Sequence, residues 1–245
     1  MMAQHDGARC CLLTGACGGI GRATAALLKR RGYKVIGLDR LWGSETSKSD
    51  FAERLTVDLA DKEAVVACLQ STEAAHGPVA ALVNAAGWTP HADFITMPVE
   101  EYEQIVQINL MGALYLLRAA LPGMIEQRTG RVVLVASDAA RVGVRGEAVY
   151  AATKGAQISL MKSLAVELGR YGLTINVVSP GSTDTPMLRG MYTEEQIAKR
   201  AAANPLGRVG APEDIASAIA FFLSEEASYI TGQVLSVNGG MARVG

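Results

Sequence analysis

The sequence predicts an α/β fold built on one parallel β-sheet with helices on both of its faces. Short apolar or β-branched runs alternate with segments of helical spacing along the 245 residues, a pattern typical of doubly wound sheets. Seven such runs are expected to form strands, and we find no linker, low-complexity segment or internal repeat between them. We therefore expect a single domain over residues 1–245, with ligands bound at the carboxyl ends of the strands.

The strands are predicted from apolar runs that are bounded by turn-forming residues. In chain order they cover residues 10–14, 33–39, 54–59, 79–83, 130–137, 173–181 and 232–239. The helices are predicted from apolar residues spaced three and four positions apart. They cover residues 23–31, 62–76, 99–112, 113–127, 150–170 and 212–224, the last with a proline in its first turn.

Residues 182–204 lie between the last two predicted strands and carry Met187, Leu188, Met191 and Tyr192. Apolar residues on a loop-like insertion of this kind indicate a lid that closes over a substrate. A helix packed permanently on the core is the alternative.

Composition limits the classes of function. The net charge is −1 without a basic cluster, so the electrostatic footprint of a nucleic-acid-binding protein is missing. No uninterrupted apolar run reaches the roughly 18 residues of a membrane span, and residues 1–9 lack the apolar core of a signal peptide. We expect a cytoplasmic protein that binds neither nucleic acid nor membrane.

The four cysteines, at positions 10, 11, 17 and 68, show no CxxC spacing. Neither a metal site nor a disulfide framework is therefore expected. Cys10 and Cys11 are adjacent within the first predicted strand, so their side chains should point to opposite faces of the sheet.

A glycine-rich turn separates the first strand from the first helix. Its candidate ligand-binding residues are Gly15, Gly18, Gly19, Ile20 and Gly21. Glycines let a backbone approach a pyrophosphate closely, and the helix N-terminus adds N–H donors and a positive dipole end. The same turn would also serve simply to pack a strand against a helix.

Asp39 ends the second strand, 18 residues after Gly21. This spacing suits a carboxylate that binds the ribose hydroxyls of a dinucleotide. Because such a carboxylate repels a 2′-phosphate, we expect NAD rather than NADP, although the adjacent Arg40 would soften that preference. At the end of the third strand, Asp58 and Leu59 would meet the adenine, or Asp58 would merely cap the next helix.

Two further groups of candidates follow. The fourth strand enters a turn of small residues, Asn84, Ala85, Ala86 and Gly87, over which a flat cofactor could lie. Asn109 lies within a predicted helix, where asparagine is a poor helix former. It is either functional or bonded locally to the backbone.

Ser137, Tyr150 and Lys154 form the main candidate catalytic group. Ser137 ends the fifth strand, while Tyr150 and Lys154 lie four residues apart on the predicted helix and share a face. The lysine ammonium should lower the pKa of the phenol. A phenol tuned in this way can exchange a proton with a substrate oxygen that Ser137 also holds.

These motifs resemble, in type and order, those of the short-chain dehydrogenase/reductase family over residues 9–241. The family's cofactor turn matches Thr14-Gly-x-x-x-Gly19-x-Gly21, and its Asn-Asn-Ala-Gly turn matches residues 84–87 except that Ala85 replaces the second asparagine. The family's catalytic tetrad matches Asn109, Ser137, Tyr150 and Lys154. Its segment beside the nicotinamide matches Pro180 and Gly181, with Thr183 or Thr185 near the carboxamide.

The resemblance implies a Rossmann-type fold and hydride transfer between NAD and a secondary alcohol or ketone. It implies that Tyr150 is the general acid/base and that Lys154 lowers its pKa and binds the nicotinamide ribose. Ser137 would polarise the substrate oxygen, and Asn109 would hold a water that continues a proton relay. A homotetramer, formed through the Tyr150 helix and the C-terminal strand, is also implied.

The substrate is less defined. Parts of the chain resemble 2-hydroxycyclohexanecarboxyl-CoA dehydrogenases, 2,3-dihydro-2,3-dihydroxybenzoate dehydrogenases and, in the C-terminal third, 3-oxoacyl-[acyl-carrier-protein] reductases. A hydroxyacyl thioester or cyclic hydroxy-acid is the leading substrate class, with a dihydrodiol as the alternative. Arg141 and Arg145 would meet a substrate anion, or else be solvated or bridge subunits. Trp88 would form an apolar wall of the pocket, or else pack in the core or at the surface. A catalytically silent NAD-binding regulator is the competing function, and a methyltransferase-like nucleotide-binding fold is the competing architecture.

Overall fold

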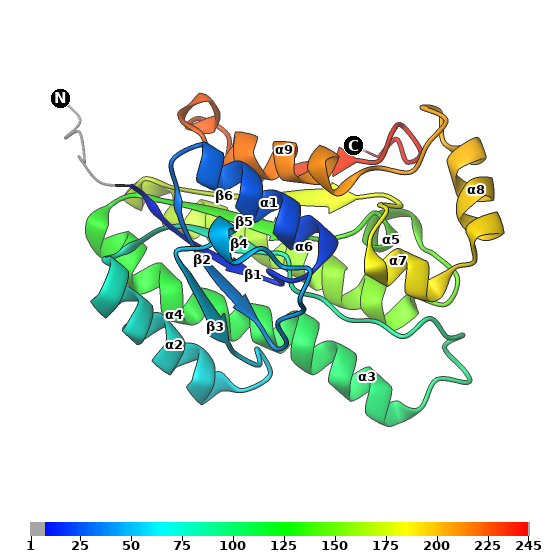
Figure 1. Cartoon of the computed structure of the whole chain (residues 1–245), viewed down its shortest axis with the longest axis horizontal. Coiled ribbons are helices and arrows are strands. Elements are labelled where there is room, and N and C mark those ends of the chain that lie inside the picture. The colour runs from blue at the N-terminus through cyan, green and yellow to red at the C-terminus, as the bar shows by residue number, and fades with distance from the viewer. Residues whose placement is uncertain (1–7, 245) are drawn as a thin grey trace.

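The computed structural model describes residues 8–244 and is built on a seven-stranded sheet in which all neighbouring strands run parallel. The strand order is β3-β2-β1-β4-β5-β6-β7, which confirms the predicted doubly wound sheet (Figure 1). The strands are β1 Cys10–Thr14, β2 Lys34–Asp39, β3 Glu53–Thr56, β4 Val79–Asn84, β5 Gly130–Val135, β6 Leu173–Pro180 and β7 Val234–Val237.

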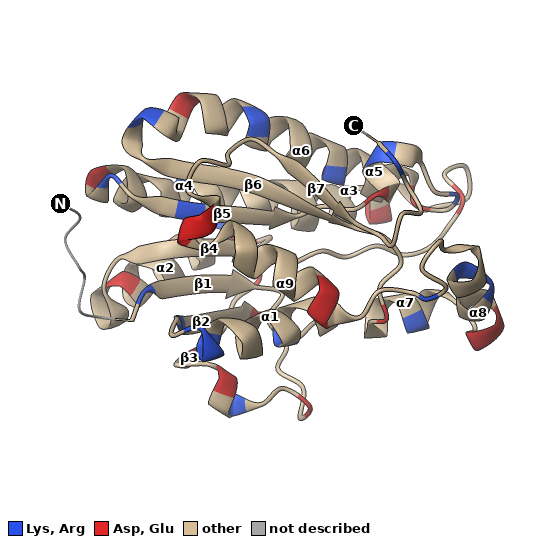
Figure 2. Cartoon of the chain, turned by 90° about the horizontal axis from the view of Figure 1, so that it is seen from above, with Lys and Arg blue, Asp and Glu red and all other residues tan. Residues whose placement is uncertain are grey.

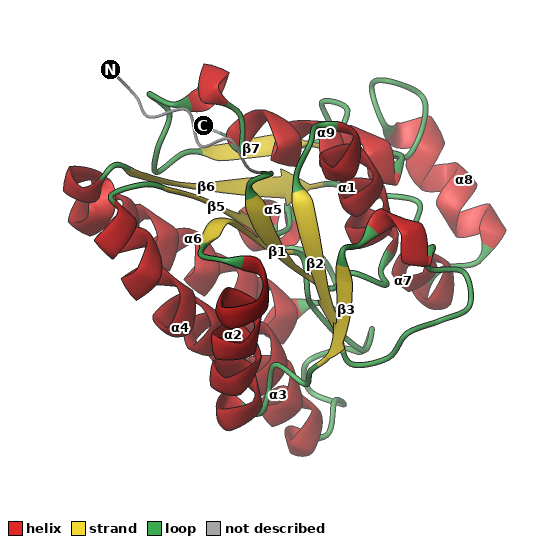
Figure 3. Cartoon of the chain, turned by 60° about the vertical axis from the view of Figure 1, so that its left-hand side comes forward, coloured by secondary structure: helices red, strands yellow, loops and turns green. Residues whose placement is uncertain are grey.

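Helices cover both faces of this sheet. Figures 1 and 3 show α1 and α9 together on one face, with α2 and α4 on the other. The helices are α1 Gly19–Arg30, α2 Lys62–His76, α3 Val99–Val106, α4 Gly112–Gln127, α5 Ala139–Val142, α6 Ala148–Leu168, α7 Pro186–Met191, α8 Glu194–Ala203 and α9 Pro212–Phe222.

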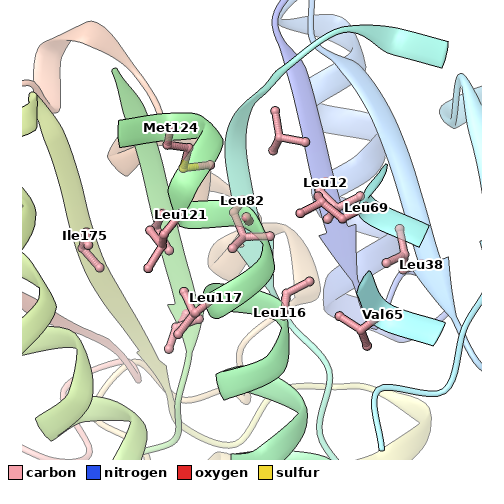
Figure 4. Packing of buried hydrophobic residues seen from close by; sticks show 14 of the residues in the cluster. Leu12, Leu38, Val65, Leu69, Leu82, Leu116, Leu117, Leu121, Met124 and Ile175 are labelled. Carbon is pink, nitrogen blue, oxygen red and sulfur yellow. The ribbon is translucent and has the colours of Figure 1, made fainter. Parts of the chain in front are cut away.

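The sheet separates two apolar layers, as alternation along its strands requires. Cys10 packs with Leu69 of α2 and Leu116 of α4, whereas Cys11 packs with Leu28 of α1 on the other face. The opposite orientation expected for the two cysteines is therefore confirmed. Figure 4 shows the layer that contains Leu69 and Leu116. Each fully buried leucine contributes about 1.5–3 kcal/mol of transfer free energy.

Several boundaries differ from the sequence prediction. Helix α1 begins at Gly19 rather than at residue 23, because the glycine turn itself supplies the first helical turn. Strand β3 ends at Thr56, so Asp58 and Leu59 follow the strand instead of ending it. Helix α5, after Ser137, was not predicted; its four residues are too few to show a period.

Residues 182–204 contain two helices, α7 and α8, rather than the predicted loop. Thr185 caps α7 ahead of Pro186, and Thr193 with Gln196 forms a capping box for α8. Both helices lie at the end of the molecule beside the carboxyl edge of the sheet (Figure 1). The order of this segment comes from these local signals, which the sequence analysis did not use.

One continuous helical segment, Val99–Gln127, joins α3 and α4 through a π-helical turn at Gln107–Met111. By length and composition alone this segment could cross a membrane, with a mean hydropathy of 1.4 in its most apolar window. Polar residues such as Gln107 and Asn109 interrupt it, so the sequence shows no uninterrupted apolar run. In the structure 44% of that window is buried inside the protein, as in a helix that packs on a sheet.

Charged residues of both signs are interspersed along the elements (Figure 2). Ion pairs at the surface include Arg9 with Glu225 and Arg208 with Asp214. The sequence-based expectation about a signal peptide falls mainly on residues 1–7, which lie outside the described part of the chain.

Candidate active site

A cavity of about 740 Å³ opens at the carboxyl edge of the sheet. Its wall is formed by the glycine turn, the segments after β4, β5 and β6, one face of α6, and helices α7 and α8. The predicted site residues in this wall are Gly15, Gly18, Gly19, Ile20, Gly21, Ala85, Gly87, Ser137, Tyr150, Lys154, Pro180, Gly181, Thr183 and Thr185.

The glycine turn is shaped for a close ligand. Gly15 has a φ of +64°, and a Cβ there would lie 2.7 Å from backbone atoms of Ala85 and Ala86. A Cβ on Gly21 would collide with the carbonyl oxygen of Gly15. Within residues 8–244 no side chain caps α1, and no acidic residue occupies its first turn. The turn therefore fits a pyrophosphate bound by backbone N–H groups.

Asp39 lies beside this turn at the end of β2. Its Oδ2 accepts a hydrogen bond from the Cys17 N–H at 2.8 Å, and its Oδ1 accepts one from the Leu41 N–H at 3.3 Å. The carboxylate is thus fixed next to the glycine turn, although Asp39 does not line the main cavity.

Arg40 and Asp58 line a second, more open cavity of about 740 Å³ together with Gln107 and Ile108. Asp58 does not cap α2: its Oδ1 accepts the Ala60 N–H at 2.9 Å, whereas Asp61 caps the helix. The capping role considered for Asp58 is therefore wrong. Leu59 is buried in the core, 7% exposed, rather than in either cavity.

Asn84 and Ala86 support the site from behind. The Asn84 side chain, 1% exposed, accepts a hydrogen bond from Thr14 Oγ1 at 2.5 Å and so ties β4 to β1. The Ala86 carbonyl accepts a hydrogen bond from Lys154 Nζ at 3.4 Å. Both residues were predicted to bind the cofactor directly, yet neither lines the main cavity.

Thr183 and Thr185 bring the segment after β6 to the cavity. Thr183 Oγ1 donates to the Gly181 carbonyl at 3.0 Å, and Thr185 caps α7 by accepting the Leu188 N–H. Both threonines line the cavity. Thr185 lies opposite the glycine turn, because a Cβ added to Gly19 would be only 2.9 Å from Thr185 Cγ2. The turn and the base of α7 are therefore in near contact.

Ser137, Tyr150 and Lys154 meet on one wall of the cavity. Ser137 follows β5, and its hydroxyl is close enough to the Tyr150 phenol to lower the pKa of the phenol. Lys154 Nζ donates to the Val135 carbonyl at 2.9 Å and lies 5.7 Å from the centroid of the Tyr150 ring. The lysine side chain is 2% exposed, so strand β5 and helix α6 together fix all three groups.

The pKa values of this group differ from the sequence-based expectation. Burial raises the pKa of Tyr150, the Glu147 carboxylate raises it further, and the Ser137 hydrogen bond offsets only part of this. Burial also lowers the pKa of Lys154 to about 8. The lowering of the tyrosine pKa that we expected from Lys154 is not among these effects, of which desolvation of the phenol is the largest.

Asn109 lies behind the wall, in the π-helical turn, and is 1% exposed. Its Oδ1 accepts the Trp88 N–H at 2.8 Å, and its Nδ2 donates to the Trp88 carbonyl at 2.9 Å. The backbone carbonyl of Asn109 accepts a hydrogen bond from Gln157 Nε2 at 2.5 Å. Gln157 Oε1 in turn accepts from Lys154 Nζ at 3.5 Å. A buried amide thus joins the lysine to the π-helical turn.

The sequence analysis missed Gln157. It lies three residues after Lys154, on the same helix face, and its side chain is fully buried. A polar residue at a position that helical spacing assigns to the core is the signal that would have found it. In the structure Gln157 occupies the space between Lys154 and the Asn109 carbonyl, where the resemblance placed a relay water.

Replacing Gln157 with Leu is expected to lower kcat about tenfold, since the loss of one buried hydrogen bond costs about 1–1.5 kcal/mol. The cofactor KM should change less, because Gln157 does not line the cavity. Gln157→Glu is the matched variant: its carboxylate should raise the pKa of Lys154 and shift the alkaline limb of the pH–rate profile to higher pH. Wild-type kcat and an unshifted profile in both variants would contradict this role.

Three residues considered for the substrate lie away from the main cavity. Arg141 donates to Ser236 Oγ at 2.7 Å, and Arg145 donates to Asp93 Oδ2 at 2.8 Å. Neither arginine lines the cavity, and neither does Trp88. The structure therefore gives both arginines intramolecular roles.

Comparison with known proteins agrees with this geometry. A family model described as Enoyl-(Acyl carrier protein) reductase matches residues 15–242. The 3-oxoacyl-[acyl-carrier-protein] reductase FabG of Salmonella typhimurium is 40% identical over 237 residues, which cover 95% of this chain and 97% of the relative. The chain belongs to the short-chain dehydrogenase/reductase family.

Other members of the short-chain dehydrogenase/reductase family are similarly close. The acetoacetyl-CoA reductase of an Acinetobacter species is 37% identical over 239 residues, which cover 94% of this chain and 96% of the relative. The ligand-free structure of the aldohexose dehydrogenase of Thermoplasma acidophilum superposes with a TM-score of 0.89 at 32% identity, covering 98% of this chain and 97% of that one. The protein is thus an oxidoreductase of this family, similar to a 3-oxoacyl-[acyl-carrier-protein] reductase and to an acetoacetyl-CoA reductase.

Proposed function

We propose that this protein is a nicotinamide-dependent reductase of a 3-oxoacyl thioester and that it prefers NAD(H) to NADP(H). The observation that carries the proposal is one cavity wall that holds Ser137, Tyr150 and Lys154 and continues into the glycine turn. The names of two relatives, a 3-oxoacyl-[acyl-carrier-protein] reductase and an acetoacetyl-CoA reductase, support a thioester substrate. The proposal includes a cytoplasmic location.

The proposed mechanism follows from the protonation states. The Tyr150 phenol is neutral at pH 7, and burial raises its pKa further. The residue would act as a general acid in the reduction direction and donate its proton to a ketone oxygen. Ser137 holds the same oxygen from the other side. Lys154, tied to Val135, Ala86 and Gln157, orients the group and supplies positive charge as the phenolate forms.

The residues that would hold the cofactor are distributed along the edge of the sheet. The glycine turn would bind the pyrophosphate, Asp39 the ribose hydroxyls, and the segment from Pro180 to Thr185 the nicotinamide end. When bound, the reduced cofactor supplies the hydride. The protein's own task is to align it with the substrate carbon and to exclude water.

Replacing Asp39 with Ser is expected to lower the preference for NAD over NADP about 100-fold, because a fixed carboxylate beside a 2′-phosphate costs several kcal/mol. The measurement is kcat/KM with each cofactor. Arg40→Ala is the matched control and should reduce the residual use of NADP while leaving NAD almost unchanged. If the ratio of kcat/KM with NAD to kcat/KM with NADP is unaltered in Asp39→Ser, the 2′ position of the bound cofactor does not lie beside Asp39.

The function itself is tested by the absorbance of reduced nicotinamide. Acetoacetyl-CoA, a cyclic 2-oxo-acid and a dihydrodiol are each supplied with NAD(H) and NADP(H). We expect turnover of the thioester with NADH. Tight NADH binding without turnover of any of the three compounds would instead favour the competing function, a catalytically silent NAD-binding regulator.

Helices α7 and α8 are proposed to act as a lid. Met187, Leu188, Met191 and Tyr192 line the cavity, and Met187 is also 41% exposed. Each of the two helices has its own N-terminal cap, which suits a segment that moves as a unit.

A homotetramer is proposed from the exposed apolar side chains on α6 and near β7. Val166 is 85% exposed, Leu235 39% and Met241 56%. This is more exposed apolar surface than a monomer needs, and it lies on surfaces rich in small residues. Light scattering at micromolar concentration should give four times the chain mass, and Val166→Glu should give a smaller species. A monomeric wild-type protein would contradict this.

A further inference from the structure

Glu147 is a charged residue in the cavity wall beside the catalytic group. It is the N-cap residue of α6, one turn before Tyr150, and both residues line the same cavity. The two side chains are close enough for the carboxylate to raise the pKa of the phenol. A substrate whose reacting carbon lies next to Tyr150 would therefore have Glu147 in the cavity wall around it.

The surroundings of Glu147 only partly neutralise it. The Tyr192 hydroxyl of the lid donates to Glu147 Oε1 at 3.4 Å. The Tyr192 ring is itself held between His91, at 5.2 Å between ring centroids, and the Arg200 guanidinium, at 3.8 Å. Within residues 8–244, none of the ion pairs includes Glu147.

Burial, the largest effect, raises the pKa of Glu147, while His91, Tyr192 and Arg200 act in the opposite direction. The carboxylate is therefore partly desolvated rather than screened by bulk water. In such a setting a second negative charge is more costly than it would be at the surface.

The nearby cations are directed elsewhere. Arg141 binds Ser236, and Arg145 binds Asp93, both outside the cavity. Lys199 lines the cavity at the lid but pairs with Glu195 at 2.8 Å. The Lys154 ammonium beside Tyr150 donates to the Val135 carbonyl, and the Arg200 guanidinium of the lid lies over the Tyr192 ring. Within the described residues neither cation forms an ion pair with Glu147, so its carboxylate stays unpaired in this part of the cavity wall.

We propose that Glu147 is a specificity-determining residue that excludes substrates with a free carboxylate close to the reacting carbonyl and admits neutral groups such as a thioester. The inference rests on the proposed function and refines its substrate class. A like-charge contact in a desolvated site costs several kcal/mol, whereas a thioester carries no charge at that position. Cyclic hydroxy-acids and carboxylated dihydrodiols are disfavoured on the same ground.

The test compares acetoacetate with its N-acetylcysteamine thioester, in which a neutral thioester replaces the carboxylate. In wild type the thioester should have the higher kcat/KM. In Glu147→Gln, which keeps the shape and the acceptor for Tyr192, the ratio of thioester to acid should fall at least tenfold through a gain with acetoacetate. Glu195→Gln, a lid carboxylate outside the cavity wall, is the control and should leave the ratio unchanged.

Binding supplies a readout that is independent of turnover. By calorimetry with the NADH complex, Glu147→Gln should bind acetoacetate at least tenfold more tightly than wild type and bind methyl acetoacetate unchanged. An unaltered affinity and an unaltered substrate ratio would overturn the inference while leaving the proposed function intact. Absence of turnover together with the expected binding change would overturn the proposed function and leave the role of Glu147.

Discussion

Replacing Tyr150 with Phe is expected to lower kcat by about 10²–10⁴-fold, the usual contribution of a positioned general acid. The phenol is neutral at pH 7 and so carries a proton to donate, and burial raises its pKa further. Phenylalanine keeps the ring and its packing, so the cavity should retain its shape. Steady-state reduction of acetoacetyl-CoA with NADH measures the loss.

Cofactor binding provides the control for Tyr150→Phe. The glycine turn and Asp39 are untouched, so the Kd for NADH should stay within about threefold of wild type, less than 1 kcal/mol. Ser137→Ala is the matched variant and should lose less activity, since the phenol keeps its proton. Full activity in Tyr150→Phe would remove the proposed general acid.

Replacing Lys154 with Met is expected to lower kcat by at least about 100-fold and to leave thermal stability at pH 7 equal or higher. The ammonium is buried, and its pKa falls from 10.5 in an unfolded chain to about 8. Holding the proton at pH 7 therefore costs the folded state about 3 kcal/mol. Methionine removes that cost but also the hydrogen bonds to the Val135 and Ala86 carbonyls.

The sign of the pH effect follows from linkage. Between pH 8 and 10.5 the unfolded chain binds the Lys154 proton and the folded chain does not, so wild-type stability gains as pH rises through this range. Below about pH 8 that gain is absent. The melting temperature of wild type minus that of Lys154→Met should thus be larger at pH 9.5 than at pH 7. A variant that unfolds far below wild type at pH 7 would instead assign Lys154 a structural role.

The fold was predictable from local patterns. Strand β5 is a run of β-branched residues, and Cys10 and Cys11 alternate across the sheet as a strand demands. The predictions failed where the sequence pattern is short. Helix α5 has only four residues and shows no helical period, and strand β3 ends before Asp58, which the prediction had included in it. The capping signals at Thr185 and Thr193 were present in residues 182–204 but were not used in the sequence analysis.

The site was predictable in its chemistry more than in its electrostatics. Residue type and spacing indicated Ser137, Tyr150 and Lys154, and the structure places them on one wall. Burial of these groups depends on all the surrounding elements, so the sequence could not show that desolvation raises the pKa of Tyr150 instead of lowering it. For the same reason Gln157 and Glu147 were overlooked: each matters through neighbours from another part of the chain.

The sequence by itself therefore determined the doubly wound sheet, the glycine turn and the candidate catalytic group, because these depend on periodicity and on residues close in the chain. Tertiary structure alone decided which polar side chains share the cavity. It turned Arg141 and Arg145 toward Ser236 and Asp93, set Gln157 between Lys154 and Asn109, and placed Glu147 in the cavity wall. Solvation and long-range contact set the charge of the site, and neither is encoded in spacing along the chain.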